Sequence, residues 1–119
     1  QVEFGEVFAA GHSERGNDLP ALLSTSKAGG LERGEFIAAA EVFQDPLWQG
    51  AAFYRAGEFE KAARAFARRD TAEAHYNQGN AWLMNGKYED AIASYDRALT
   101  RRPGWQEAAD NRELAAARL

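Results

Sequence analysis

Small and aromatic residues recur along this chain in one fixed order. Gly34, Gly57 and Gly86 are each followed by an aromatic residue two positions later, and a second aromatic follows seven positions after the first. A small pair or near-pair lies between the two aromatics of each segment, namely Ala39-Ala40, Ala62-Ala63 and Ala91-Ile92. Offsets of three, four and seven lie on one face of a helix. Each segment therefore predicts a tight turn at a left-handed glycine, followed by an amphipathic helix.

Local signals predict further helices between and after these segments. Asp45 followed by Pro46 is typical of a helix start, with aspartate as the N-cap and proline in the first turn. Asp70 is the expected N-cap of the next helix. Pro103 blocks continuation of the helix before it, and a final helix is expected over about residues 105–119.

Two more helices are expected in the first 30 residues. Their apolar positions have helical spacing and are Phe4, Val7 and Phe8 in the first helix and Leu19, Leu22 and Leu23 in the second. Gly11 can end the first helix, and Asn17 or Asp18 can cap the second. No segment shows the sustained alternation of a strand. The pattern therefore predicts an all-α chain whose short connections make neighbouring helices antiparallel.

Composition narrows the classes of function. A chain of 119 residues with 45% hydrophobic residues is enough for one domain with one core. The net charge of −4 argues against nucleic acid or an anionic membrane as the main partner. The chain has no cysteine, which excludes disulfides and thiolate metal sites. No apolar run approaches the roughly 20 residues of a membrane helix, so we expect no direct membrane insertion.

Residues 72–105 resemble a tetratricopeptide repeat over its whole length. The stretch reads AEAHYNQGNAWLMNGKYEDAIASYDRALTRRPGW. Its small, aromatic and terminating residues stand at the signature sites of such a repeat, and these residues are Gly79, Trp82, Ala91, Tyr95, Ala98 and Pro103. A glycine and an alanine at a helix crossing allow two helix axes to approach closely. One helix pair cannot bury its apolar faces alone, so pairs are expected to stack.

Residues 45–71 look like a second, shortened copy of the repeat. Gly50, Phe53, Ala62 and Phe66 match the same signature sites, whereas Arg69 replaces the second small residue. The resemblance implies a right-handed α-solenoid of antiparallel helix pairs with about seven helices. It comprises degenerate N-terminal helices in 1–44, the shortened repeat in 45–71, a full repeat in 72–105 and a C-terminal capping helix in 106–119. The second helix of the shortened repeat is expected to lack more than one turn.

A wider stretch resembles a narrower bacterial group. The sequence DPLWQGAAFYRAGEFEKAARAF, followed by AEAHYNQGNAW, is similar to tetratricopeptide proteins associated with von Willebrand factor A-domain proteins of the aerotolerance type. That group is typically periplasmic or attached to the membrane. The resemblance implies a partner with a von Willebrand factor A domain and a periplasmic or envelope-associated location, with the cytoplasm as the alternative.

The resemblance also implies a concave groove lined by the first helix of each pair. The groove residues mix apolar, aromatic and hydrogen-bonding side chains, and they are Leu47, Ala51, Tyr54, Arg55, Tyr76, Asn80, Leu83 and Met84. Such a surface suits a peptide or a helix of a partner protein. The competing interpretation is that Tyr54 and Leu83 pack between repeats.

Some tetratricopeptide proteins hold the C-terminal carboxylate of a peptide in this groove. Asn77, Asn80 and Asn111 fall where asparagines of such a clamp can fall. Tyr76 and Glu73 stand where positive residues would be expected, so the charge-assisted hydrogen bonds of a strong carboxylate site are lacking. We therefore expect Asn77 to bond between helices instead.

Nothing in the sequence predicts catalysis, a metal site or a cofactor. His12 and His75 are 63 residues apart and have no cysteine nearby. Acidic pairs such as Glu89 and Asp90 fit the first turn of a helix, where negative charge is stabilising. Ser94 has no evident base partner. We therefore expect a non-catalytic module that binds protein in its groove, and the alternative is a structural domain that associates with copies of itself.

Overall fold

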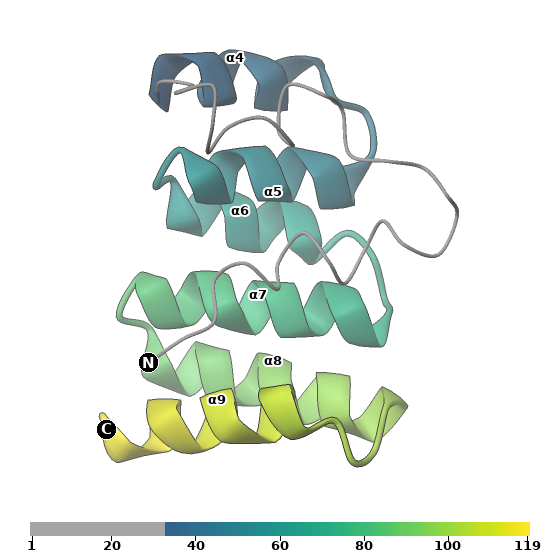
Figure 1. The fold of residues 1–119 in the computed structure, drawn as a ribbon, viewed down its shortest axis with the longest axis vertical. Helices are drawn as coiled ribbons and strands as arrows, with labels where there is room; N and C mark the ends of the chain where they lie inside the picture. The colour runs from purple at the N-terminus through teal and green to yellow at the C-terminus, as the bar shows by residue number, and fades with distance from the viewer. Residues whose placement is uncertain (1–32) are drawn as a thin grey trace.

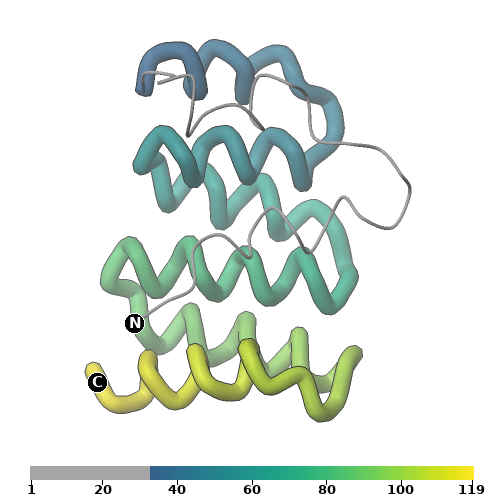
Figure 2. The backbone as a smooth tube through the Cα atoms, in the orientation of Figure 1, coloured from purple at the N-terminus to yellow at the C-terminus, as the bar shows by residue number. Residues whose placement is uncertain are grey.

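The computed structural model describes residues 33–119, which fold into a stack of six helices. They are α4 (Arg33–Val42), α5 (Pro46–Arg55), α6 (Phe59–Phe66), α7 (Ala72–Met84), α8 (Tyr88–Arg101) and α9 (Gln106–Ala117). Each helix packs mainly on the next one along the chain, and α7 also touches α9. α5, α7 and α9 lie on one side of the stack, with α6 and α8 behind them (Figures 1 and 2). The helices predicted around Phe4 and Leu19 lie outside the described residues.

Asp45 and Pro46, which are adjacent in the sequence, determine where α5 starts. The side chain of Asp45 accepts a hydrogen bond of 2.9 Å from the backbone N–H of Leu47, and Pro46 occupies the first helical position. Proline is tolerated there because the first helical N–H has no intrahelical acceptor. The predicted N-cap and the predicted proline are both confirmed.

Glycine ends α5 and α7 in the same way. Gly57 and Gly86 have φ values of 83° and 77°, which are left-handed. At the second turn the N–H of Lys87 bonds to the carbonyl of Trp82 at 2.9 Å, and the N–H of Gly86 bonds to that of Leu83 at 3.1 Å. This pair of bonds is a Schellman motif, which satisfies carbonyls that the helix end would leave without donors. The left-handed conformation predicted for these two glycines is confirmed.

Two local predictions were wrong. Gly34 lies inside α4 and has no positive φ, so the turn predicted there is absent. Thr71, rather than Asp70, caps α7, because its hydroxyl accepts a hydrogen bond of 3.1 Å from the N–H of Ala74. Asp70 lies one residue earlier, and its carboxylate instead bonds to His75.

The core forms where each aromatic of a second helix meets the glycine of the first. A Cβ atom added at Gly50 would lie 2.5 Å from the ring of Phe66, and one added at Gly79 would lie 2.6 Å from that of Tyr95. The absence of a side chain at these glycines lets the rings lie directly against the α5 and α7 backbones. The half-buried ring of Trp82 packs against the buried clusters of both helix pairs.

The two helix pairs differ in length as the sequence indicates. α6 has 8 residues, whereas α8 has 14. The difference of six residues is more than one turn of a helix, which has 3.6 residues. α9 follows α8 and buries Ala108, Asn111 and Ala115. Its exposed positions include Gln106, Glu107 and Asp110, as expected for a polar end of a helical stack.

Candidate partner-binding surface

The candidate surface is defined here as the eight residues that the sequence predicts along α5 and α7. Three of them are half-buried, namely Leu47, Arg55 and Met84. Five are at most 6% exposed, namely Ala51, Tyr54, Tyr76, Asn80 and Leu83. The burial of Tyr54 and Leu83 agrees with the interpretation that these side chains pack between repeats. The half-buried residues are therefore the ones that can reach a partner without rearrangement of the core.

Aromatic rings pack against the two buried tyrosines of the candidate surface. The rings of Tyr54 and Phe59 meet edge to face, with centroids 5.3 Å apart. Tyr76 is fully buried, and its ring centroid lies 4.5 Å from that of Trp105 and 6.1 Å from that of Tyr95. Such contacts fix ring orientation and add stabilisation beyond the area buried. Burial raises the pKa of the Tyr54 and Tyr95 hydroxyls above their ordinary value of 10.0, and the neighbouring Tyr76 raises them further.

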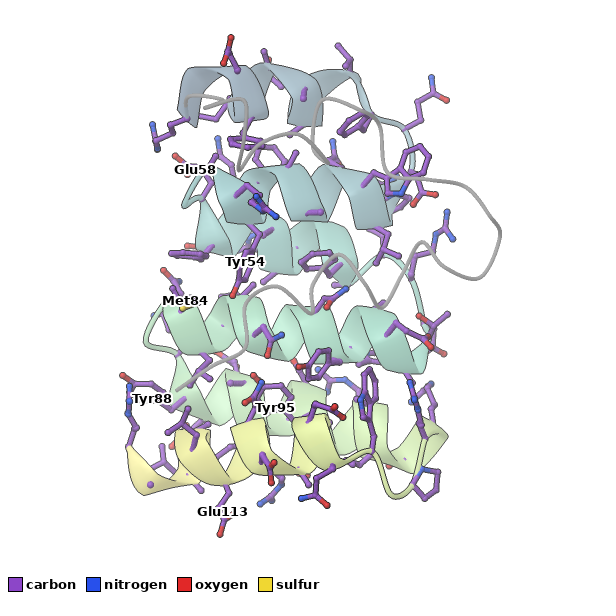
Figure 3. The ribbon with its side chains drawn as sticks, in the orientation of Figure 1. Tyr54, Glu58, Met84, Tyr88, Tyr95 and Glu113 are labelled. Carbon is purple, nitrogen blue, oxygen red and sulfur yellow. The ribbon has the colours of Figure 1, made fainter. Side chains whose placement is uncertain are left out.

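A buried polar cluster connects α7, α8 and α9. The hydroxyl of Tyr95 donates a hydrogen bond of 2.5 Å to Oδ1 of Asn80, and Nδ2 of Asn111 donates one of 3.0 Å to the same oxygen. Figure 3 shows Tyr95 between α7 and α9. Nδ2 of Asn80 is buried and has no hydrogen-bond partner among residues 33–119. A buried donor of this kind is costly unless an acceptor reaches it.

The asparagines considered for a carboxylate clamp are thus partly engaged with each other. Asn80 and Asn111 bond directly, so their first role is to hold α9 on α7. Tyr76 is buried, and Glu73 is half-buried. Arg55 is the basic member of the candidate surface, and burial lowers the pKa of its guanidinium.

A separate depression lies on α9. Asp110, Asn111, Glu113, Leu114 and Ala117 line a shallow depression on this helix. The carboxylate of Asp110 accepts a hydrogen bond of 2.7 Å from Gln106. Residues 106–119 were predicted to form a capping helix, and Asn111 within them was considered for the carboxylate clamp.

His75 on α7 contacts the exposed Asp70. The side chain is only 8% exposed, and its Nε2 lies 2.7 Å from a carboxylate oxygen of Asp70. Arg101 pairs with the same oxygen at 2.5 Å, so the α6–α7 connection is tied to the end of α8. The hydrogen bonds from His75 and Arg101 lower the pKa of Asp70. Among residues 33–119, no three histidine or acidic side chains gather as a metal site would require.

The acidic residues in the first turns of α6 and α8, namely Glu60, Glu89 and Asp90, are exposed on the surface. Glu60 pairs with Arg64 one helical turn away, and this hydrogen bond lowers the pKa of Glu60. The hydroxyl of Ser94 donates to the backbone carbonyl of Asp90 at 3.0 Å. These contacts give the residues structural roles. Within the described part of the chain, no helix combines the length and apolar character needed to cross a membrane.

A comparison with known protein families agrees with the assignment of α5–α6 and α7–α8 as helix pairs of a repeat. The family model of the tetratricopeptide repeat matches residues 47–104, which span α5, α6, α7 and α8. The searches of curated proteins and of solved structures gave no significant match.

Proposed function

Because the chain is a tetratricopeptide repeat protein over residues 47–104, we propose that it binds a partner protein through the candidate surface on α5 and α7. Tetratricopeptide repeats are, as a family, modules of protein–protein interaction. The proposed role is to hold a segment of the partner, and no chemical step is part of it.

The proposal is supported by the presence of two kinds of residue in the candidate surface. Tyr54 and Tyr76 are buried, whereas the half-buried residues Leu47, Arg55 and Met84 form what we call the rim. Tyr54 and Tyr76 are buried against other rings, so their positions are set before a partner arrives. Leu47, Arg55 and Met84 remain half-buried beside them. A preorganised site loses less conformational entropy on binding. Arginine is enriched among the residues that dominate interfaces, and methionine adapts to the shape of an apolar partner.

The side chains of the rim favour a particular kind of partner segment. Leu47 and Met84 offer apolar contacts on two different helices, and Arg55 offers a cation at the end of α5. An amphipathic helix or an extended peptide with apolar anchors and an acidic group fits these residues. Arg55 would then be the point of charge recognition, because a half-buried guanidinium forms stronger hydrogen bonds to a carboxylate than an exposed one.

We further propose a von Willebrand factor A-domain protein of a bacterial envelope as the partner. The support is the sequence similarity of residues 45–66 and 72–82 to the tetratricopeptide proteins associated with that group. The periplasmic or envelope-associated location has the same support and is part of the same proposal.

Affinity capture from the envelope fraction of the source organism tests the binding surface. The full chain is compared with Arg55→Glu/Met84→Glu, which removes one positive charge from the rim and adds two negative charges. Ala93→Glu/Arg97→Glu is the matched control, because it makes the same charge change at exposed positions of α8. Both variants must give the helical circular dichroism of the parent.

We expect the parent and the α8 control to retain the same partner and the rim variant to lose it by more than tenfold. Equal capture by all three proteins would contradict the proposed surface. Recovery of the chain alone, with a mass in solution that rises with concentration, would favour self-association instead. A captured protein without a von Willebrand factor A domain would contradict the identity of the partner and leave the surface assignment standing.

A further inference from the structure

The register of α7 recurs on α9 after one repeat length. α9 begins at Gln106, which lies 34 positions after Ala72, the first residue of α7. The full repeat over 72–105 also has 34 residues, so residues at this separation occupy equivalent sites on the two helices. The candidate-surface residues of α7 pair with their α9 equivalents as Tyr76 with Asp110, Asn80 with Leu114, Leu83 with Ala117 and Met84 with Arg118. α7 and α9 lie on the same side of the stack (Figure 1).

The depression on α9 lies at these equivalent positions. Asp110, Leu114 and Ala117 are three of its five lining residues, and Asn111 and Glu113 are the other two. Asp110 and Ala117 are exposed, and Leu114 is half-buried. The repeat register and the shape of the surface thus select the same face of α9 independently of each other.

A buried hydrogen bond joins the depression to the candidate surface. Asn111 lines the depression and is 5% exposed, and its Nδ2 donates to Oδ1 of Asn80 on α7 at 3.0 Å. One wall of the depression is therefore fixed relative to α7. Nδ2 of Asn80 has no hydrogen-bond partner among residues 33–119, so this junction keeps a donor that a carbonyl of a bound segment could satisfy.

The candidate surface and the depression differ in charge. Arg55 supplies a cation at the end of α5, whereas the five lining residues of the depression include two carboxylates and no cation. Gln106 donates a hydrogen bond of 2.7 Å to the carboxylate of Asp110 and so restrains its position. Figure 3 shows Glu113 pointing away from the other helices at the α9 end of the stack. The charge therefore changes sign from α5 to α9.

The cations of α9 do not cancel this difference. Arg112 pairs with Asp96 of α8 at 2.5 Å, and neither Arg112 nor Arg118 lines the depression. The two carboxylates of the depression are thus available to a basic group of a partner, and the half-buried Leu114 between them offers an apolar contact.

We propose that one segment of the partner spans the candidate surface and the α9 depression, with an acidic residue at Arg55 and a basic residue at Asp110 and Glu113. This inference rests on the proposed function and adds an orientation to it. The reversed segment would bring like charges together at both ends, which disfavours it. The longest dimension of the described fold is 34 Å and runs from α4 to α9, so about ten extended residues are long enough.

Peptide selection on the full chain tests the proposal without the natural partner. The library consists of random peptides of about twelve residues displayed on phage, which is long enough to span the surface. We expect the enriched peptides to have lysine or arginine near one end and aspartate or glutamate near the other, always in the same order. A synthetic peptide with the enriched sequence then serves as the probe for affinity measurements.

Charge reversal on α9 tests the position of the basic residue. Asp110→Lys/Glu113→Lys should weaken binding of the probe by roughly tenfold or more, because like charges then face each other. Glu89→Lys/Asp90→Lys is the matched control, since it reverses one glutamate and one aspartate at exposed positions of α8. The control should bind the probe as the parent does. A second probe, with glutamate in place of its basic residues, should bind the α9 variant more tightly than it binds the parent.

Four results would overturn the inference. They are the absence of enriched peptides, enriched peptides without a basic residue, equal losses in the α9 variant and the α8 control, and a second probe that does not prefer the α9 variant. A parent chain that dimerises at the assay concentration, with a monomeric α9 variant, would also overturn it, because a second copy would then occupy the depression.

The rim variant Arg55→Glu/Met84→Glu separates this inference from the proposed function. Loss of probe binding in the rim variant but not in the α9 variant would remove the inference and leave the proposed function. Loss in the α9 variant but not in the rim variant would place binding on α9 alone and contradict the candidate surface. Losses in both variants, with the α8 control unchanged, are the expected result.

Discussion

The hydroxyl of Tyr95 on α8 donates a buried hydrogen bond of 2.5 Å to Oδ1 of Asn80 on α7. Asn111 on α9 donates to the same oxygen at 3.0 Å. One carbonyl oxygen thus joins the three helices of the C-terminal half. The contact explains why a polar side chain at the centre of α7 is compatible with full burial.

Removal of the Tyr95 hydroxyl is predicted to destabilise this junction. Tyr95→Phe keeps the ring against Gly79 but deletes the donor to Asn80, at an expected cost of about 1–2 kcal/mol. Urea unfolding measures the change. Tyr88→Phe is the control, because Tyr88 is only half-buried, and its cost should stay within about 0.5 kcal/mol. Equal costs for the two variants would argue that the buried bond is energetically unimportant.

Alkaline pH is predicted to unfold the protein through its buried tyrosines. The folded-state pKa values of Tyr54 and Tyr95 are raised, so both hydroxyls stay protonated at pH values where the unfolded chain begins to ionise. The unfolded state then binds fewer protons, and stability falls as pH rises above the unfolded tyrosine pKa of about 10. Each group contributes a slope of up to about 1.4 kcal/mol per pH unit.

The pH dependence is measured by urea unfolding between neutral pH and about pH 11. Tyr95→Phe should reduce the slope above about pH 10 while leaving the slope near neutral pH unchanged. A slope that does not depend on Tyr95 would show that other groups control the alkaline transition.

Filling the position of Gly79 is predicted to force α7 and α8 apart. A Cβ atom there would lie 2.6 Å from Cε1 of Tyr95, so Gly79→Leu should cost about 1–3 kcal/mol or more by overpacking. Gly34→Ala is the control, because no atom of the described residues lies within 4 Å of its added Cβ and the residue is helical. It should be neutral or stabilising by up to about 1 kcal/mol. Thermal denaturation compares the two, and equal melting temperatures would contradict the close approach at Gly79.

Gly86→Ala is predicted to be destabilising for a different reason. Nothing lies within 4 Å of an added Cβ, but the φ of 77° strains any side chain. The expected cost is about 1–2 kcal/mol. Gly86→Asn should cost less than Gly86→Ala, because asparagine tolerates the left-handed region. The reverse order in unfolding free energy would contradict the backbone explanation.

The sequence predicted features that depend on neighbouring residues. The pair Asp45-Pro46 determines the start of α5 through one side-chain bond and one fixed φ, and both effects act within two residues. The glycines at 57 and 86 end helices through hydrogen bonds that span six residues at most. The repeat signature adds the longer-range contacts of Phe66 and Tyr95 with glycines 16 positions earlier.

Features that depend on competition between neighbours were harder to predict. Asp70 and Thr71 are both good N-caps, and the choice of Thr71 follows from the contacts of Asp70 with His75 and Arg101. Gly34 resembles the other turn glycines in sequence, yet it lies within α4. The burial of Tyr76 depends on Trp105, which lies 29 positions away and was not considered as its neighbour.

Chemical-shift mapping on the full chain with the captured partner can show whether the partner binds the candidate surface on α5 and α7. Titration with the partner is expected to shift the amide signals of Leu47, Arg55 and Met84 most strongly, and to leave those of the exposed positions Ala93 and Arg97 on α8 unchanged. Shifts centred on α8 instead, with the α5 and α7 signals unaffected, would contradict binding through the candidate surface.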